Sequence, residues 1–168
     1  QLMKEKGLIT KLDKTKISNI NNLNPNYLGL YFDMSNEYSL PFLAATTVIA
    51  YNKAVIKENI TGYKDLLNSK YVNDIVLLDD QRIIIGMALL ALGYDMNDTN
   101  KDHLNQAKDW LLKLKKNVKA FDSDSPKTFL MTNEVDIGFM WNAEAALAME
   151  YNSNIKIVYP EEGFAISL

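Results

Sequence analysis

The sequence predicts an α/β fold in which helices cover both faces of a mixed β-sheet. Short apolar segments rich in Val, Ile, Phe and Tyr alternate with longer helical segments, which is the pattern of a sheet covered on both sides. At 168 residues, the chain is long enough to bury roughly 70% of its unfolded surface. Its contents of 48% hydrophobic and 23% charged residues are typical of globular domains.

The first part of the chain is expected to be mostly irregular. A short helix over 2–6 should end at Gly7, because glycine readily adopts the left-handed conformation that follows a last helical turn. The stretch 13–36 is rich in Asn, Ser and Pro and is expected to be a long surface connection. Strands are predicted over 38–44 and 46–51, the first at a sheet edge or crossover because it contains a proline.

The rest of the chain should form the alternating strands and helices. The helix expected over 81–92 is apolar on nearly every face, so it should lie between the sheet and other elements. The helix expected over 99–116 is amphipathic, and Thr99 with Asp102 resembles a capping box; Ser125 should cap the helix after it. The full set is a short helix over 61–67, strands over 74–78, 118–121, 135–140 and 155–159, and helices over 81–92, 99–116, 125–131 and 142–151.

Composition excludes several classes of protein. The chain contains no cysteine, which rules out disulfides, thiolate nucleophiles and thiolate zinc sites. The net charge is −3 and Arg82 is the single arginine, so nucleic acid is not an expected partner. No apolar run approaches the ~20 residues that span a bilayer, and contact with a membrane is expected only through an anchor or a permease.

The sequence offers no assembled active site. His103 is the single histidine, and we expect it on the solvent-facing side of the helix 99–116. No nucleophile motif, metalloprotease motif or glycine-rich phosphate loop is present. We therefore predict no catalytic residues, no cofactor and no metal.

Three strand ends carry side chains suited to binding. In an open α/β sheet, ligands collect at the carboxyl ends of the strands. Each of these side chains also has a structural interpretation, since an acidic residue at a helix start can be a cap, the tryptophan can be core and a helix glutamate can simply be solvated. The residues concerned are Asp79 and Asp80, then Asp122 to Ser125, and then Trp141 and Glu144.

Five blocks stand in one order along the chain: YSLPF with TTVIAYN (38–42 and 46–52), LLDDQR (77–82), FDSDSP (121–126), VDIGFMWN (135–142) and YPEEG (159–163). Together they resemble the spermidine/putrescine-binding proteins of ABC importers, and the resemblance extends from Lys4 to Gly163, nearly the whole chain. This resemblance implies a type II periplasmic-binding fold, in which two α/β lobes close over a solute and deliver it to permease subunits.

The resemblance also implies how the chain is organised. Residues 1–37 would be the tail of the first lobe and a surface connection. Residues 38–168 would be the second, ligand-binding lobe, with interlobe crossover strands near 38–52 and 160–168. We expect the chain to be an excised piece of a longer parent, whose remaining residues supply the missing first lobe and a further site aspartate. The expected location is extracytoplasmic, in a periplasm or on a membrane-anchored lipoprotein.

The resemblance implies particular site residues. Asp80 matches the aspartate that pairs with a ligand amine, Trp141 a tryptophan packed along the ligand's methylenes, and Ser123 a serine near the ligand. The family has an acidic residue where this chain has Ile83 and an aromatic residue at Ser167. Glu144, three residues beyond Trp141, is the candidate for a substitute carboxylate.

Other functions stay open from the sequence alone. The same fold could hold another small organic cation, or an anion seated at a helix N-terminus. A lobe of a two-lobed, hydrolase-like enzyme is a second class, and an interaction module that docks on a permease is a third. The two departures from the family pattern leave the particular solute open.

Overall fold

The computed structural model describes residues 2–167, which fall into two compact units. The smaller unit runs up to Ala44 and includes Ser167, and the larger unit comprises Ala45–Ile166. A strand was expected over 38–44, and that prediction was wrong: the first strand begins at Ala45. The backbone N–H groups of Tyr38 and Ser39 donate to the Asp33 carboxylate, at 2.9 and 2.8 Å, instead of to a sheet.

The smaller unit is built from short turns and has almost no core. Helix α1 (Leu2–Glu5) is followed by Gly7 with a φ of +63°, as predicted. The surface connection contains three 3-10 turns, which are η1 (Lys14–Lys16), η2 (Ile20–Asn22) and η3 (Pro25–Tyr27).

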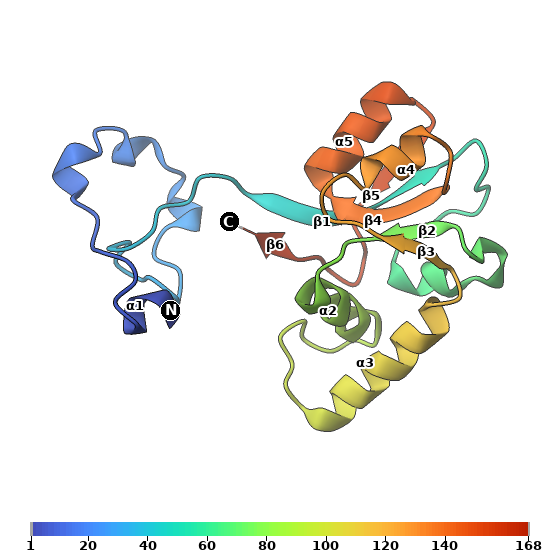
Figure 1. Cartoon of the computed structure of the whole chain (residues 1–168), viewed down its shortest axis with the longest axis horizontal. Coiled ribbons are helices and arrows are strands. Elements are labelled where there is room, and N and C mark those ends of the chain that lie inside the picture. Colours follow the sequence, from blue (N-terminus) through green and yellow to red (C-terminus); the bar gives the residue numbers. More distant parts are fainter. Residues whose placement is uncertain (1, 168) are drawn as a thin grey trace. The chain divides into compact units, whose positions relative to one another are not determined.

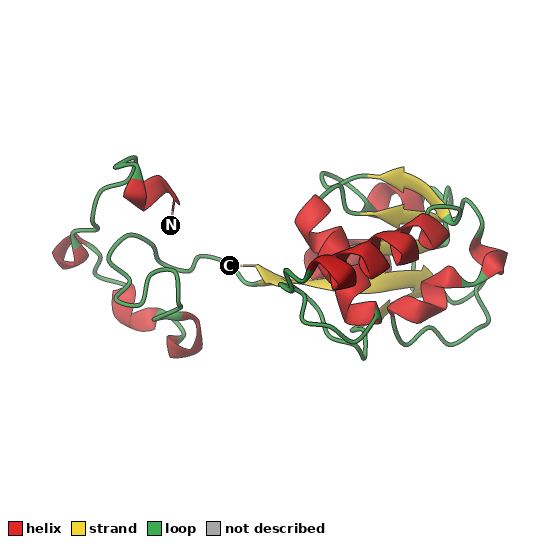
Figure 2. Ribbon diagram, turned by 90° about the horizontal axis from the view of Figure 1, so that it is seen from below, coloured by secondary structure: helices red, strands yellow, loops and turns green. Residues whose placement is uncertain are grey.

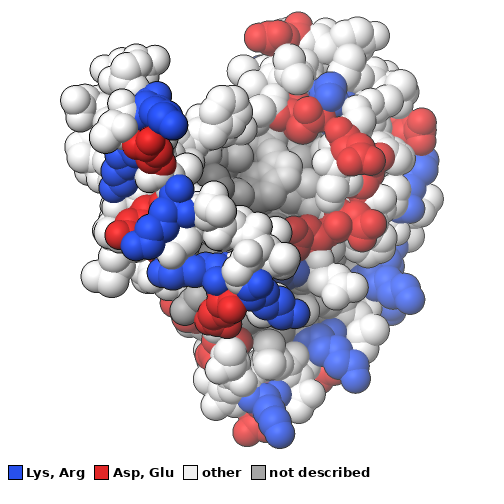
Figure 3. Space-filling view, turned by 60° about the vertical axis from the view of Figure 1, so that its left-hand side comes forward, with Lys and Arg blue, Asp and Glu red and all other residues white. Residues whose placement is uncertain are grey.

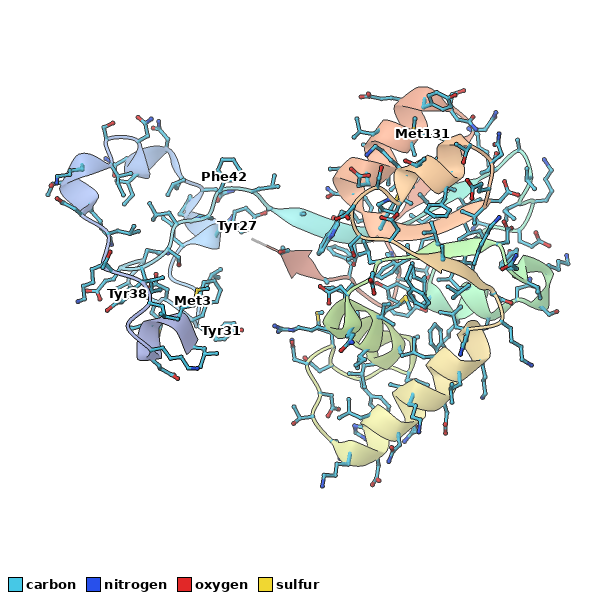
Figure 4. All side chains as sticks on the ribbon, viewed as in Figure 1. Met3, Tyr27, Tyr31, Tyr38, Phe42 and Met131 are labelled. Atoms are coloured by element: carbon cyan, nitrogen blue, oxygen red, sulfur yellow. The ribbon has the colours of Figure 1, made fainter. Side chains whose placement is uncertain are left out.

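The smaller unit carries five aromatic residues, four of which are labelled in Figure 4. Tyr31, Phe32 and Phe42 are exposed, whereas Tyr27 and Tyr38 are partly buried. The Lys4 ammonium lies 4.6 Å from the centroid of the Tyr38 ring, next to α1. The side chain of Phe42, in the segment that precedes β1, is 97% exposed. Within the described part of this unit, Asp33 is the one buried residue, so no hydrophobic core stabilises it internally.

A mixed sheet forms the centre of the larger unit, as predicted (Figure 1). The strand order is β3-β2-β4-β1-β5. Strand β2 runs parallel to β3 and β4, whereas β1 is antiparallel to β4 and β5. A short additional strand, β6, pairs with β1. The strands are β1 (Ala45–Asn52), β2 (Ile75–Leu77), β3 (Val118–Phe121), β4 (Ile137–Trp141), β5 (Ile155–Val158) and β6 (Ile166–Ser167).

Helices cover both faces of this sheet (Figures 1 and 2). Helices α2 (Gln81–Ala91) and α3 (Lys101–Leu114) contact each other on one face. Helices α4 (Lys127–Met131) and α5 (Asn142–Tyr151) contact each other on the opposite face. The chain between β1 and β2 forms two 3-10 turns, η4 (Tyr63–Leu67) and η5 (Ser69–Tyr71), where an α-helix over 61–67 was expected.

Two predicted caps were wrong in detail. Asn100, not Thr99, caps α3, and its side-chain oxygen accepts from the N–H of Asp102 at 2.9 Å. The Ser125 side chain does not cap α4 through a backbone N–H; its hydroxyl lies 2.9 Å from that of Thr128. At α3, Thr99 and Asn100 are both suited to the cap by type, so sequence could not choose between them; at α4 the N-cap is Pro126 and no side chain caps the helix.

The segment that returns after β5 is held by a buried tyrosine. The Tyr63 hydroxyl donates to the Gly163 carbonyl at 2.9 Å, and the Glu162 carboxylate accepts from the Tyr63 N–H at 3.1 Å. Burial raises the pKa of the Tyr63 phenol, so it stays protonated as a donor. The Tyr63 ring also packs edge-on against Phe139 of β4, with centroids 5.7 Å apart.

Candidate functional site

Three loops follow the carboxyl ends of the parallel strands β3, β2 and β4. Strands β2 and β4 are neighbours, and Leu77, the last residue of β2, pairs with Phe139 of β4. The residues after these strands therefore lie at one edge of the sheet. Figure 3 shows acidic side chains gathered on the face of the larger unit that this view turns forward.

Asp80 begins α2 and keeps part of its carboxylate free. Its backbone is extended (φ −136°, ψ 108°), and Oδ1 accepts from the Ile83 N–H at 3.1 Å as the helix N-cap. The residue is exposed, and within residues 2–167 no basic side chain forms an ion pair with it. A carboxylate has about four acceptor positions, so Asp80 can cap the helix and still accept from a ligand.

Ser123 connects two of the three loops. Its hydroxyl oxygen accepts from the backbone N–H of Asp79 at 2.8 Å. The Asp122 N–H donates to the Leu77 carbonyl at 2.9 Å, which joins the same two loops a second time. Ser123 is exposed, but its best-defined contact holds the backbone directly before Asp80.

Trp141 is the last residue of β4 and precedes α5. It pairs with Thr47 at the end of the β1–β4 ladder and is half-buried, with part of the ring against the core. The next residue, Asn142, accepts from the Thr46 N–H at 3.2 Å through its side-chain oxygen. This bond ties the start of α5 to β1 and so restrains the backbone at Trp141. The core interpretation of Trp141 therefore holds for the part of the ring that packs against the core.

Glu144 lies in the first turn of α5 and is already paired. Its Oε2 is 2.7 Å from Nζ of Lys127, at the start of α4. The two side chains are only 20% and 24% exposed. Sequence analysis identified Glu144 but missed Lys127. The pairing depends on how α4 packs on α5, and no local motif signals it.

His103 is placed differently from the prediction. Its ring is partly buried and stacks on Tyr94, with centroids 3.8 Å apart, and Nδ1 is 2.7 Å from the Asp98 carboxylate. The side chain fastens the α2–α3 connection to α3. Hydrogen bonds from the Asn100 backbone and from His103 lower the pKa of Asp98.

Neither a metal cluster nor a membrane span is found in the described chain. Residues 2–167 contain no group of three or more His, Asp or Glu side chains arranged to hold a metal ion. Over the same residues, no helix has the length and apolarity required to cross a bilayer.

The sequence matches the family model of the bacterial extracellular solute-binding proteins over residues 1–168. The chain belongs to this family. It is 39% identical over 162 residues to the spermidine/putrescine-binding periplasmic protein of Salmonella typhimurium, covering 96% of this chain and 47% of that protein. It is 31% identical over 145 residues to the putrescine/cadaverine-binding protein of Pseudomonas aeruginosa, covering 82% of this chain and 40% of that protein.

Solved structures give the same result. The spermidine/putrescine ABC transporter substrate-binding protein of Streptococcus pneumoniae matches with a TM-score of 0.85 and 35% identity, over 98% of this chain and 51% of that one. A structure from Listeria monocytogenes matches with a TM-score of 0.92 and the same identity. The predicted periplasmic-binding fold is confirmed. The chain spans about half the length of the relatives it matches.

Proposed function

We propose that the chain is the ligand-holding lobe of a receptor that captures a polyamine outside the cytoplasmic membrane and delivers it to an ABC permease. Family membership supports a solute-binding role, and the names of the relatives support a polyamine as the solute. In this proposal the protein binds and releases its ligand unchanged, so its site needs no catalytic group.

One observation carries the choice of ligand. The carboxylate of Asp80 has no ion-pair partner within residues 2–167, and it follows a strand adjacent to the one that ends at Trp141. A polyamine presents ammonium groups separated by methylenes, so its site needs a carboxylate and an apolar wall at neighbouring points. A carboxylate–ammonium hydrogen bond is roughly twice as strong as a neutral one.

Trp141 suits the wall. An indole face next to a cation contributes about 2 kcal/mol when the cation is desolvated, and less when it is exposed. The half-buried ring packs against the core on one side, and the Asn142 bond to β1 restrains the backbone that carries it. Such a ring can hold a methylene chain without losing much conformational freedom.

The other two predicted residues receive narrower roles. Ser123 would act mainly by holding the Asp79 backbone, since its oxygen accepts from that N–H. Glu144 would contribute less charge than a free carboxylate, because Lys127 neutralises it. Asp80 and Trp141 are thus the residues expected to contact the solute directly from this lobe.

The rest of the site would come from the parent protein. The smaller unit buries almost none of its own side chains, which supports its assignment to a first lobe completed by other residues. That lobe would close over the solute, and the permease subunits would be the macromolecular partners. Attachment to the membrane would be through an anchor or the permease.

Calorimetry of the full-length parent tests the proposal. Titration with putrescine and spermidine should give heat with at least one of them. The change Asp80→Asn keeps a good N-cap but removes the charge, and it should weaken binding at least about thirtyfold, or about 2 kcal/mol. Asp109→Asn removes the same charge from the exposed surface of α3 and should change nothing. No heat with either amine, or equal affinities for the wild type and Asp80→Asn, would refute the proposal.

A further inference from the structure

Lys127 and Glu144 form a largely covered ion pair at the edge of the sheet where the ligand is proposed to bind. The pair joins the first turns of α4 and α5, which follow β3 and β4. Glu144 is three residues beyond Trp141, and Lys127 is four residues beyond Ser123. The Lys127 ammonium is also 3.4 Å from the Ser125 hydroxyl, in the same loop as Ser123.

The two charges differ from the other acidic groups of the three loops. Asp79, Asp80 and Asp124 are exposed, Asp122 is partly buried, and within residues 2–167 none of them forms an ion pair. Glu144 and Lys127 are roughly four-fifths covered by protein and lie 2.7 Å apart. Charges covered to this extent are screened by salt much less than exposed ones.

A lysine side chain in this position does chemically what a ligand amine would do. It presents a primary ammonium on a methylene chain to a carboxylate at the start of a helix. With that carboxylate occupied, a third ligand ammonium, which a triamine has and a diamine lacks, finds no free partner at Glu144 and meets the positive charge of Lys127 instead. No carboxylate substitutes for it one turn into α2, because that position is Ile83, which packs against the core.

We propose that Lys127 is a specificity-determining residue: a built-in ammonium that occupies Glu144, so that this lobe favours a short diamine over a longer polyamine. The inference rests on the proposed function and adds to it the charge class of the preferred ligand. Specificity of this kind is a difference between two affinities, achieved here by a repulsive group.

The test compares a diamine with a triamine on the full-length parent. Affinities for putrescine and spermidine are measured by calorimetry at one fixed salt concentration for the wild type and Lys127→Met. Methionine keeps the length of the side chain and removes its charge, which frees Glu144. The ratio of the two affinities should shift toward spermidine at least tenfold.

A second change attributes the effect to Glu144. In the double variant Lys127→Met with Glu144→Gln, the freed carboxylate is gone, and the ratio should return to within about twofold of the wild-type value. If the pair only holds α4 against α5, Lys127→Met weakens both ligands equally and the ratio stays constant. An unchanged ratio, or a shift that persists in the double variant, overturns the inference.

Failure to fold would leave the inference testable. If Lys127→Met does not give a folded protein, Glu144→Gln alone is used, which leaves the Lys127 ammonium unpaired. This variant should weaken spermidine at least threefold more than putrescine, and equal weakening overturns the inference.

The proposed function can also fail separately. If the wild type binds neither amine, that proposal is wrong, and Lys127→Met alone decides the inference. Spermidine binding that appears in this variant and is lost in the double variant supports the inference that Lys127 blocks Glu144, whereas continued absence of binding overturns it.

Discussion

Asp80 has two tasks that can be separated by mutation. Its side chain caps α2 through the Ile83 N–H, and its charge is proposed to bind an amine. Asparagine and aspartate are about equally good N-caps, whereas alanine costs about 1 kcal/mol. We expect Asp80→Asn to leave the free energy of unfolding within about 0.5 kcal/mol of the wild type, and Asp80→Ala to lower it by about 1 kcal/mol.

Urea denaturation of the full-length parent measures both values. Binding should be lost to a similar degree in the two variants, because each of them removes the charge. Equal destabilisation by asparagine and alanine would show that the carboxylate charge, and not the cap, stabilises α2.

Ser123 is predicted to act through the backbone before Asp80. The change Ser123→Ala removes the acceptor for the Asp79 N–H, which is exposed and can bond to water instead. Polyamine affinity should fall about threefold to tenfold, while the free energy of unfolding changes by less than about 1 kcal/mol. Calorimetry and denaturation of the same sample check this, with Ser123→Thr as the variant that keeps the hydroxyl. A loss of affinity in Ser123→Thr as large as in Ser123→Ala would contradict the hydroxyl's role.

Single residues show that the sequence can predict where a side chain stands along the chain, but not which distant side chain it contacts. The positions of Asp80 and Trp141 after strands could be predicted from the sequence pattern, whereas their roles in ligand binding come from the family resemblance and stay predictions. The Lys127–Glu144 pair and the Ser123–Asp79 bond join residues 17 and 44 positions apart. Contacts of this kind depend on the packing of separate elements, and local spacing contains no information about them.

At the scale of elements, the helices of the larger unit were predictable from apolar periodicity. Helix α5 was expected over the same residues that form it, and α2 within one residue. The strand expected over 38–44 failed because the buried Asp33 takes the N–H groups of Tyr38 and Ser39. A composition rich in β-formers gives only a preference for a strand. Here the hydrogen bonds that backbone N–H groups donate to the Asp33 carboxylate outweigh that preference.

Two acidic residues at the amino ends of the parallel strands are predicted to lower the stability of the fold. Asp74 precedes β2 and Asp136 precedes β4; the Asp74 carboxylate accepts from the Asp136 N–H at 2.8 Å. Burial, and then the charge of Asp136, raise the pKa of Asp74, and burial raises that of Asp136. A raised carboxyl pKa means that the folded state binds the proton more tightly than the unfolded state does. The charged form therefore destabilises the fold above the folded pKa, and the cost disappears as the pH falls toward the unfolded value of about 3.9.

The change Asp74→Asn should consequently stabilise the full-length parent at pH 7. Asparagine keeps an oxygen that can accept from the Asp136 N–H and removes the partly buried charge. Its Tm should exceed that of the wild type at pH 7, and the difference should shrink toward zero near pH 3.5. Thermal unfolding followed by circular dichroism measures this, with Asp109→Asn as the control for loss of an exposed charge. A Tm below that of the wild type at pH 7 would contradict the assignment.

At the scale of the whole molecule, the chain holds one side of a proposed site. It spans about half the length of its relatives, and Asp80 and Trp141 lie at one edge of one sheet. Binding sites for small molecules bury 70–90% of their ligand, which a single lobe cannot achieve. We expect the 168-residue chain to bind putrescine or spermidine at least about a hundredfold more weakly than the parent does. Calorimetry of the two proteins side by side checks this, and equal affinities would show that the second lobe contributes nothing.

A crystal structure of the full-length parent grown with putrescine tests the central claim most directly. The account predicts a ligand ammonium within about 2.7–2.9 Å of the Asp80 carboxylate, with the methylene chain along the Trp141 ring and the Lys127–Glu144 pair intact. A ligand seated away from both Asp80 and Trp141, or held on this lobe by Glu144 with Lys127 displaced, would contradict it.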